Sequence, residues 1–371
     1  MPSLLDPITL GELRLPNRIV MAPLTRNRSS GAGRVPNALM REYYMQRASA
    51  GAIITEATSV SPSGVGYPHT PGIWSEEQVA GWRSVVEGVH AEGGRILLQL
   101  WHVGRISDPS YHDGAAPVAP SSIAAKGTVS LLRPVRGYPV PRALTTDEIP
   151  GIVESFRAAA ANAKAAGFDG VELHGANGYL LDQFLQDGTN RRTDRYGGSI
   201  ENRARLMLEV TDAVTSVWGA GRVGVHLAPR GDAHDIGDSD PASTFGYLVR
   251  RLSERGIAFL CVRESLTGHR HGPALKAEFK GVYIANEGFT QETADAALAA
   301  GEADAVAFGK LFISNPDLPH RFRTGDALAR WNSETFYTQG YEGYTDYHPS
   351  AGVAKASSSA AATGDALAHG E

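Results

Sequence analysis

The chain has only one cysteine, Cys261, among its 371 residues. A single cysteine excludes an internal disulfide framework and any metal site built from several cysteines. No apolar run approaches the ~20 residues of a membrane-spanning helix, and the first residues lack the basic and apolar regions of a signal peptide. Lys and Arg (35) are outnumbered by Asp and Glu (40), which gives a net charge of −5 rather than the basic footprint of a nucleic-acid binder. We therefore expect a soluble, cytoplasmic, globular protein that binds neither nucleic acid nor membranes.

Several catalytic motifs are also missing. The chain has no G-x-S-x-G nucleophile elbow, and its 12 histidines include no H-E-x-x-H zinc spacing. The acidic run at 235–240 lacks the terminal Glu of a calcium loop. These absences favour a protein without a metal site.

What the chain does have is a series of short apolar segments. Their continuous apolar character is typical of strands buried on both faces. The candidate strands are Arg18–Pro23, Ala52–Thr58, Arg95–Trp101, Gly170–Gly175, Val223–Pro229, Ile257–Glu264, Gly281–Asn286 and Asp304–Gly309.

Helical segments alternate with these strands, and several have readable ends. They run from Ser75-x-x-Gln78 to Gly93-Gly94, from Thr145-x-x-Glu148 to Gly167, over Ile200–Trp218, from Asp240-Pro241 to near Gly256, and over Gln291–Ala300 after Thr290. Eight strands alternating with helices predict a single-domain (β/α)8 TIM barrel. A doubly wound open sheet is the alternative, but Pro23-Leu24-Thr25 stands where its G-x-G-x-x-G would follow the first strand.

We expect the barrel to occupy residues 1–350. The segment 102–145 after the third strand is dense in Pro and Gly and is expected to form a lid, and another long loop, 177–199, follows the fourth strand. Residues 351–371 are mostly Ala, Ser and Gly and predict a flexible tail. Functional residues are sought on the strand-to-helix loops, where TIM barrels carry their active sites.

Three polar side chains cluster just beyond the fourth strand. His174 and Asn177 can both donate hydrogen bonds to one substrate oxygen, and Tyr179 can donate a proton nearby. Ordinary loop capping by Asn, with His and Tyr as packing residues, is the structural alternative.

Other strands end in residues that suit a cofactor. Gln99 and Trp101 leave the third strand toward the same face, and a buried glutamine needs polar partners, which a ring-shaped polar cofactor would supply. A hydrogen bond to the backbone is the alternative. Thr25 and Ala57 end the first and second strands, and neither is informative alone.

The loops after the seventh and eighth strands favour a phosphate site. They contain Gly288 and Gly309-Lys310, and in TIM barrels these loops use backbone N–H groups and a helix N-terminus to hold a phosphate. The alternative is that the glycines merely terminate strands.

Together these motifs resemble the Old Yellow Enzyme family of flavoprotein reductases, in its classical branch, from Leu5 to Tyr347. The most specific matching stretches are MAPLTR at 21–26, LQLWHVGR at 98–105, HGANGYLLDQF at 174–184, RTDRYGGSIENR at 192–203, NPDLP at 315–319 and EGYTDY at 342–347.

The resemblance implies an FMN-binding barrel reduced by NADPH or NADH. The flavin N5 would then deliver hydride to the β-carbon of an α,β-unsaturated carbonyl or a nitroalkene, a small-molecule substrate. It also implies site residues. Those for FMN are Pro23, Leu24, Thr25, Ala57, Gln99, His226, Gly288, Gly309 and Lys310. His174 and Asn177 would hold the substrate oxygen, Tyr179 would protonate the α-carbon, and Tyr67, Trp101 and Tyr344 would shape the substrate pocket.

Three positions depart from the family pattern. His226 stands on the fifth strand where arginine is usual, Lys310 replaces the usual arginine, and Glu287 places an acid in the phosphate loop. Each weakens the expectation of ordinary FMN binding.

Two other functions remain open. A biosynthetic isomerase or cyclase could use the same polar cluster without net redox turnover, and a barrel that has lost FMN could serve as a non-catalytic module. The sequence leaves the physiological substrate undefined and is compatible with a monomer or a homodimer.

Overall fold

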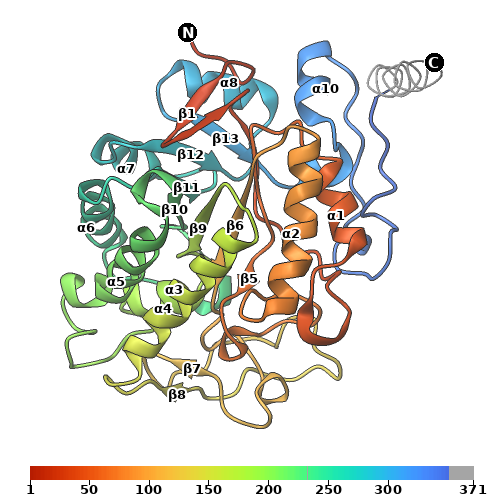
Figure 1. The fold of residues 1–371 in the computed structure, drawn as a ribbon. Coiled ribbons are helices and arrows are strands. Elements are labelled where there is room, and N and C mark those ends of the chain that lie inside the picture. Colours follow the sequence, from red (N-terminus) through yellow and green to blue (C-terminus); the bar gives the residue numbers. More distant parts are fainter. Residues whose placement is uncertain (232, 351–371) are drawn as a thin grey trace.

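The computed structural model describes residues 1–231 and 233–350, so the predicted tail lies outside the described residues (Figure 1). Its centre is a closed barrel of eight parallel strands, in which β13 pairs with β3 and β4 pairs with β6. In barrel order the strands are β3 (Ile19–Met21), β4 (Ala52–Ile54), β6 (Ile96–Trp101), β9 (Gly170–His174), β10 (Val223–Leu227), β11 (Phe259–Arg263), β12 (Val282–Asn286) and β13 (Ala305–Phe308). The closed ring confirms the TIM barrel and excludes the open sheet.

Helices surround the barrel. They are α1 (Ala38–Met45), α2 (Glu76–Ala91), α3 (Ile149–Ala165), α4 (Leu180–Leu185), α5 (Ile200–Trp218), α6 (Pro241–Glu254), α7 (Gly272–Glu278), α8 (Gln291–Ala299), α9 (Lys310–Ser314) and α10 (Leu318–Thr324). Alternation along the strands separates two cores. On β6, Leu98 and Leu100 pack outward with the helices, whereas Leu97 packs inside the barrel with residues such as Cys261.

Two details differ from the sequence predictions. The third helix does not begin at Thr145: the Glu148 carboxylate folds back onto the Thr145 N–H at 2.8 Å, and α3 starts only at Ile149, just ahead of Pro150. The second strand is also interrupted. It breaks after Ile54, where the Glu56 carboxylate turns to accept the Arg26 N–H at 3.2 Å, and a short β5 (Thr58–Ser59) follows.

A hairpin closes the amino-terminal end of the barrel. Its strands are β1 (Ile8–Leu10) and β2 (Leu13–Leu15), and their leucines pack against the barrel interior. The turn presses on the far side of the ring, where the Glu12 N–H donates to the Gly221 carbonyl at 3.0 Å. A Cβ on Gly11 would lie 2.2 Å from that carbonyl oxygen, so only glycine fits there. Access to the interior is therefore left to the carboxyl end of the strands.

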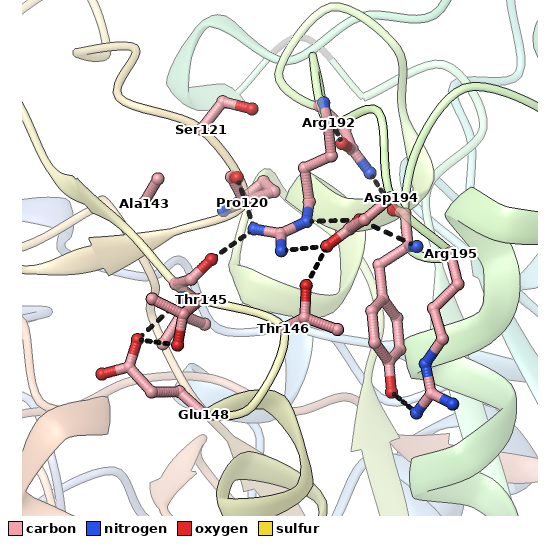
Figure 2. Close-up of polar contacts among 12 residues, drawn as sticks. Pro120, Ser121, Ala143, Thr145, Thr146, Glu148, Arg192, Asp194 and Arg195 are labelled. Carbon is pink, nitrogen blue, oxygen red and sulfur yellow. Dashed lines mark hydrogen bonds and ion pairs between the residues drawn. The ribbon is translucent and has the colours of Figure 1, made fainter.

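The lid segment (residues 102–145) lies at that carboxyl end. Two stretches of it pair as short strands, β7 (Val118–Ala119) and β8 (Arg142–Ala143). The Arg192 guanidinium ties the chain just after each of these strands to the loop after β9, because it donates to the carbonyls of Pro120 at 3.1 Å and Leu144 at 2.5 Å (Figure 2). Asp194 holds the same guanidinium from the other side at 3.0 and 2.5 Å, and the arginine keeps the pKa of that carboxyl well below its usual range. We call Arg192 and Asp194 the lid clamp.

Within the described residues, every helix is too short or too polar to cross a lipid bilayer.

Candidate functional site

A cavity of about 1140 Å³ opens at the carboxyl end of the barrel. Its volume slightly exceeds the usual range for small-molecule sites, about 300–1,000 Å³. The predicted residues among those that line it are Pro23, Leu24, Thr25, His174, Asn177, His226, Gly288, Gly309 and Lys310.

His174 and Asn177 present hydrogen-bond donors on one wall. The Nδ1 atom of His174 accepts the Ala176 N–H at 3.4 Å, so Nε2 carries the proton of the neutral ring. Burial, together with the nearby His226, His234 and Arg263, lowers the pKa of His174 well below its ordinary value and keeps it neutral. Asn177 has a φ of +58, a conformation in which Asn is enriched. Its Oδ1 accepts from Arg263 at 2.9 Å, which leaves the amide N–H group as the donor.

Tyr179 lies directly beside these donors. Its ring meets the His174 ring edge-on, with centroids 4.9 Å apart, and meets Trp101 edge-on at 5.0 Å. Its hydroxyl lies 2.9 Å from that of Tyr67. Burial raises the pKa of Tyr179 well above its ordinary value, so the hydroxyl retains its proton at neutral pH. Ala57 packs in the same cluster, which Tyr138 of the lid segment also contacts.

A buried polar cluster lies inside the barrel. The Gln99 amide donates to the Glu172 carboxylate at 2.8 Å and lies 3.4 Å from Nδ1 of His226. That Nδ1 is 3.5 Å from the same carboxylate. The Nε2 atom of His226 is buried and has no partner among the described residues. Gln99 therefore makes side-chain contacts rather than the backbone bond considered as its alternative.

The phosphate-type loops come together at one end of the cavity. Gly288 has a φ of +79, in the left-handed region that favours glycine, and Gly309 precedes α9. The Glu287 carboxylate turns to the Arg263 guanidinium, with contacts of 3.2 and 3.3 Å. The charge of Glu287, the acid that departs from the family pattern, is thus offset by Arg263 on the neighbouring strand β11.

The structure does not bring Tyr344 to the cavity. Its ring is fully buried and stacks on Tyr43 with centroids 4.0 Å apart, and the guanidinium groups of Arg26 and Arg28 lie 5.1 and 4.7 Å from its centroid. Phe336 and Tyr337 from the same carboxyl-terminal segment line the cavity instead.

Sequence reasoning missed two residues of the site, Arg263 and His234. A signal for Arg263 existed, since it follows Phe259 and Cys261 at a spacing of two and so belongs to the inward face of its strand. His234 lies in a loop whose path no periodicity predicts.

Comparison with known proteins identifies the family. The model of the NADH:flavin oxidoreductase / NADH oxidase family matches residues 3–328. The protein 12-oxophytodienoate reductase 1 of Oryza sativa subsp. japonica is 45% identical over 356 residues, which cover 93% of this chain and 92% of the relative. The Old Yellow Enzyme homologue from Zymomonas mobilis has a TM-score of 0.91 and 46% identity, over 94% of this chain and 99% of that chain. Morphinone reductase in complex with tetrahydroNAD has a TM-score of 0.91 and 50% identity, over 94% of this chain and 98% of that chain.

The chain belongs to the Old Yellow Enzyme family.

As a member of the Old Yellow Enzyme family, the chain is an NAD(P)H-dependent flavin oxidoreductase with FMN as its cofactor. The residues present fit FMN. The orphaned Nε2 of His226 is buried at the cavity wall, where a polar ring edge would give it a partner. Gly288, Gly309 and Lys310 offer backbone N–H groups and a cation at the other end, as a phosphate requires.

Proposed function

We propose that this enzyme reduces the activated C=C bond of α,β-unsaturated carbonyl compounds or nitroalkenes with NADPH or NADH. The observation that carries the proposal is the arrangement of two neutral N–H donors, on His174 and Asn177, beside a protonated Tyr179. Relatives named 12-oxophytodienoate reductase and morphinone reductase support a carbonyl-bearing substrate.

The two donors suit a substrate whose oxygen gains negative charge. Hydride addition to an enone moves charge onto the carbonyl oxygen, so donors fixed at that atom stabilise the transition state more than the ground state. Both donors are held in place from behind, His174 by the Ala176 N–H and Asn177 by Arg263. Removal of one such donor typically costs about 10²–10³ in rate.

Tyr179 completes the reaction. FMN, when bound, supplies the hydride to the β-carbon, and the neutral Tyr179 hydroxyl donates its proton to the α-carbon. Trp101 and Tyr67 pack around Tyr179 and exclude water from it.

The cofactor contacts are part of the proposal. Pro23, Leu24 and Thr25 form the wall that the flavin ring would face, and Gln99 and His226 lie at its inner edge. Morphinone reductase has been seen with tetrahydroNAD, and a nicotinamide reductant would enter the same cavity. We propose a cytoplasmic monomer or homodimer.

The test is the oxidation of NADPH and NADH by the FMN-loaded protein with 2-cyclohexenone, with identification of the product. Saturated cyclohexanone and one oxidised nicotinamide per molecule support the proposal. A yellow protein that rearranges a candidate substrate without consuming NAD(P)H would favour the isomerase or cyclase, and failure to bind FMN would favour a non-catalytic barrel.

A further inference from the structure

A chain of three side chains leads away from Tyr179 to the loop after β10. The Tyr179 and Tyr67 hydroxyls are 2.9 Å apart, and the Tyr67 hydroxyl lies 3.2 Å from Nε2 of His234. The other ring nitrogen of His234, Nδ1, lies 2.7 Å from the backbone carbonyl of Asn177. Both tyrosines are buried, whereas His234 is partly exposed. The chain therefore connects the proposed proton donor with a partly exposed histidine.

The carbonyl of Asn177 fixes the direction of the hydrogen bonds. A carbonyl oxygen only accepts, so Nδ1 of His234 must carry a proton. In the neutral ring Nε2 then has a lone pair, and Tyr67 must donate to it. The oxygen of Tyr67 is left to accept from Tyr179, so the Tyr179 hydrogen points away from the substrate.

Protonation of His234 reverses this direction. A proton on Nε2 donates to Tyr67, Tyr67 donates to Tyr179, and the Tyr179 hydrogen is released toward the cavity. With neutral His234, Tyr179 can turn to the substrate only by giving up its bond to Tyr67. One hydrogen bond corresponds to a factor of up to about ten in such an equilibrium.

We propose that His234 controls and replenishes the proton of Tyr179 through Tyr67. The inference rests on the proposed function of Tyr179. The protons balance along the chain: Tyr179 gives one to the α-carbon, Tyr67 gives one to Tyr179, and protonated His234 gives its Nε2 proton to Tyr67. Neutral His234 keeps its Nδ1 proton, which is hydrogen-bonded to the Asn177 carbonyl, and regains its Nε2 proton from water.

Several groups around His234 affect its charge. Burial lowers the pKa of His234, the Asn177 carbonyl raises it, and the positive charge of Arg105 lowers it. Arg105 donates to the backbone carbonyls of His234 and Asp235 at 3.0 and 2.9 Å, and the Asp235 carboxylate is paired with Lys126 at 3.0 Å. The rings of Tyr138 and Tyr179 pack against the His234 imidazole. The delivering form is therefore favoured in mildly acidic solution and is lost as pH rises.

The test uses the FMN-loaded enzyme, reduced and then mixed with 2-cyclohexenone in a stopped-flow instrument between pH 5 and 8.5. We expect the wild-type rate to fall by up to about tenfold as His234 loses its proton. His234→Gln leaves no group at this position that titrates between pH 5 and 8.5, so the rate should be independent of pH. Tyr67→Phe interrupts the chain and should also remove the pH dependence. His269→Asn, at an exposed histidine, is the control and should retain the wild-type profile.

A second measurement does not depend on activity. Nitrogen-15 NMR of the histidine rings should show neutral His234 with its proton on Nδ1, and a titration midpoint that matches the kinetic one. A neutral ring protonated on Nε2, or an unchanged pH profile in His234→Gln and Tyr67→Phe, would overturn the proposal. A wild-type enzyme that reduces no enone would instead refute the proposed function, while the NMR titration still reports on the hydrogen-bond chain.

Discussion

Arg263 donates a hydrogen bond to Oδ1 of Asn177 across 2.9 Å, from the end of β11 to the loop after β9. A guanidinium has no acceptor, so it can contact only the oxygen of the amide. The contact thereby fixes which end of Asn177 faces the cavity. Arg263 is itself held by the Glu287 carboxylate at 3.2 Å. Glu287 thus supports the position of Asn177 through one intervening side chain.

Removal of this guanidinium should weaken ligand binding at the donors. In Arg263→Met the Asn177 amide is free to turn, so we expect phenols and enones to bind about tenfold more weakly, the lower end of the range for one hydrogen bond to a charged group. Spectral titration of the FMN-loaded protein with a phenol measures the dissociation constant. Arg230→Met is the matched control, because the Arg230 guanidinium donates at 2.8 Å to the Thr267 carbonyl rather than to Asn177. Equal phenol affinity in Arg263→Met and the wild type would contradict the orienting role.

Tyr179→Phe should separate the two half-reactions. Loss of a general acid typically costs about 10²–10⁴ in rate, so reoxidation by an enone should slow by that factor. Reduction of the flavin by NADPH needs no proton from Tyr179 and should stay within about twofold of the wild type. Stopped-flow absorbance follows both steps, and Tyr341→Phe, at an exposed position, serves as control. Equal slowing of both steps would remove Tyr179 from its proposed role.

His226→Arg should strengthen FMN binding. Reduced flavin carries negative charge near N1, and arginine stays charged at every ordinary pH, whereas the charge of histidine depends on pH. The Glu172 carboxylate, 3.5 Å from the ring, is placed to pair with the new guanidinium. We expect a lower FMN dissociation constant for the variant. An equal dissociation constant in the variant and the wild type would show that His226 does not face the flavin.

Glu56→Gln should stabilise the protein in neutral and alkaline solution. Complete burial raises the pKa of Glu56 to about 7. Because Glu56 holds its proton more tightly in the folded state, the protein loses unfolding free energy as pH rises from the unfolded pKa of Glu56, near 4.5, to its folded pKa. Glutamine is neutral throughout and keeps an acceptor for the Arg26 N–H. The gain in unfolding free energy should be about 1–3 kcal/mol at pH 8 and should nearly vanish at pH 4.5. Urea unfolding at the two pH values measures it, and an equal effect at both would show that Glu56 remains charged when folded.

The sequence predicted the barrel because its strands are apolar on both faces and its helices carry local start signals. Ser75 and Thr290 do cap their helices, since each capping bond spans only three residues. Glu56 interrupted the second strand because its partner, Arg26, lies on another strand-end loop, and no local pattern reports such a contact.

The residues of the candidate site also fall into those with a local sequence signal and those placed by distant contacts. His174 ends its strand, and Asn177 and Gly309 lie within three residues of strand ends, so the fold alone brings them to one cavity. Tyr344 lies far along the carboxyl-terminal segment, and its packing near Arg26 and Arg28 depends on side chains more than 300 residues earlier. Arg263 and His234 contact partners on other loops, so single sequence motifs could not predict their place in the site.

The lid clamp has a consequence for protein engineering. Because Arg192 holds the chain at Pro120 and at Leu144, the stretch between them is fastened at both ends to the loop after β9 (Figure 2). That stretch can therefore be exchanged as one segment. Lid sequences from relatives could be grafted between the two fastened points to alter which substrates enter, while the barrel and the His174–Asn177 wall remain untouched.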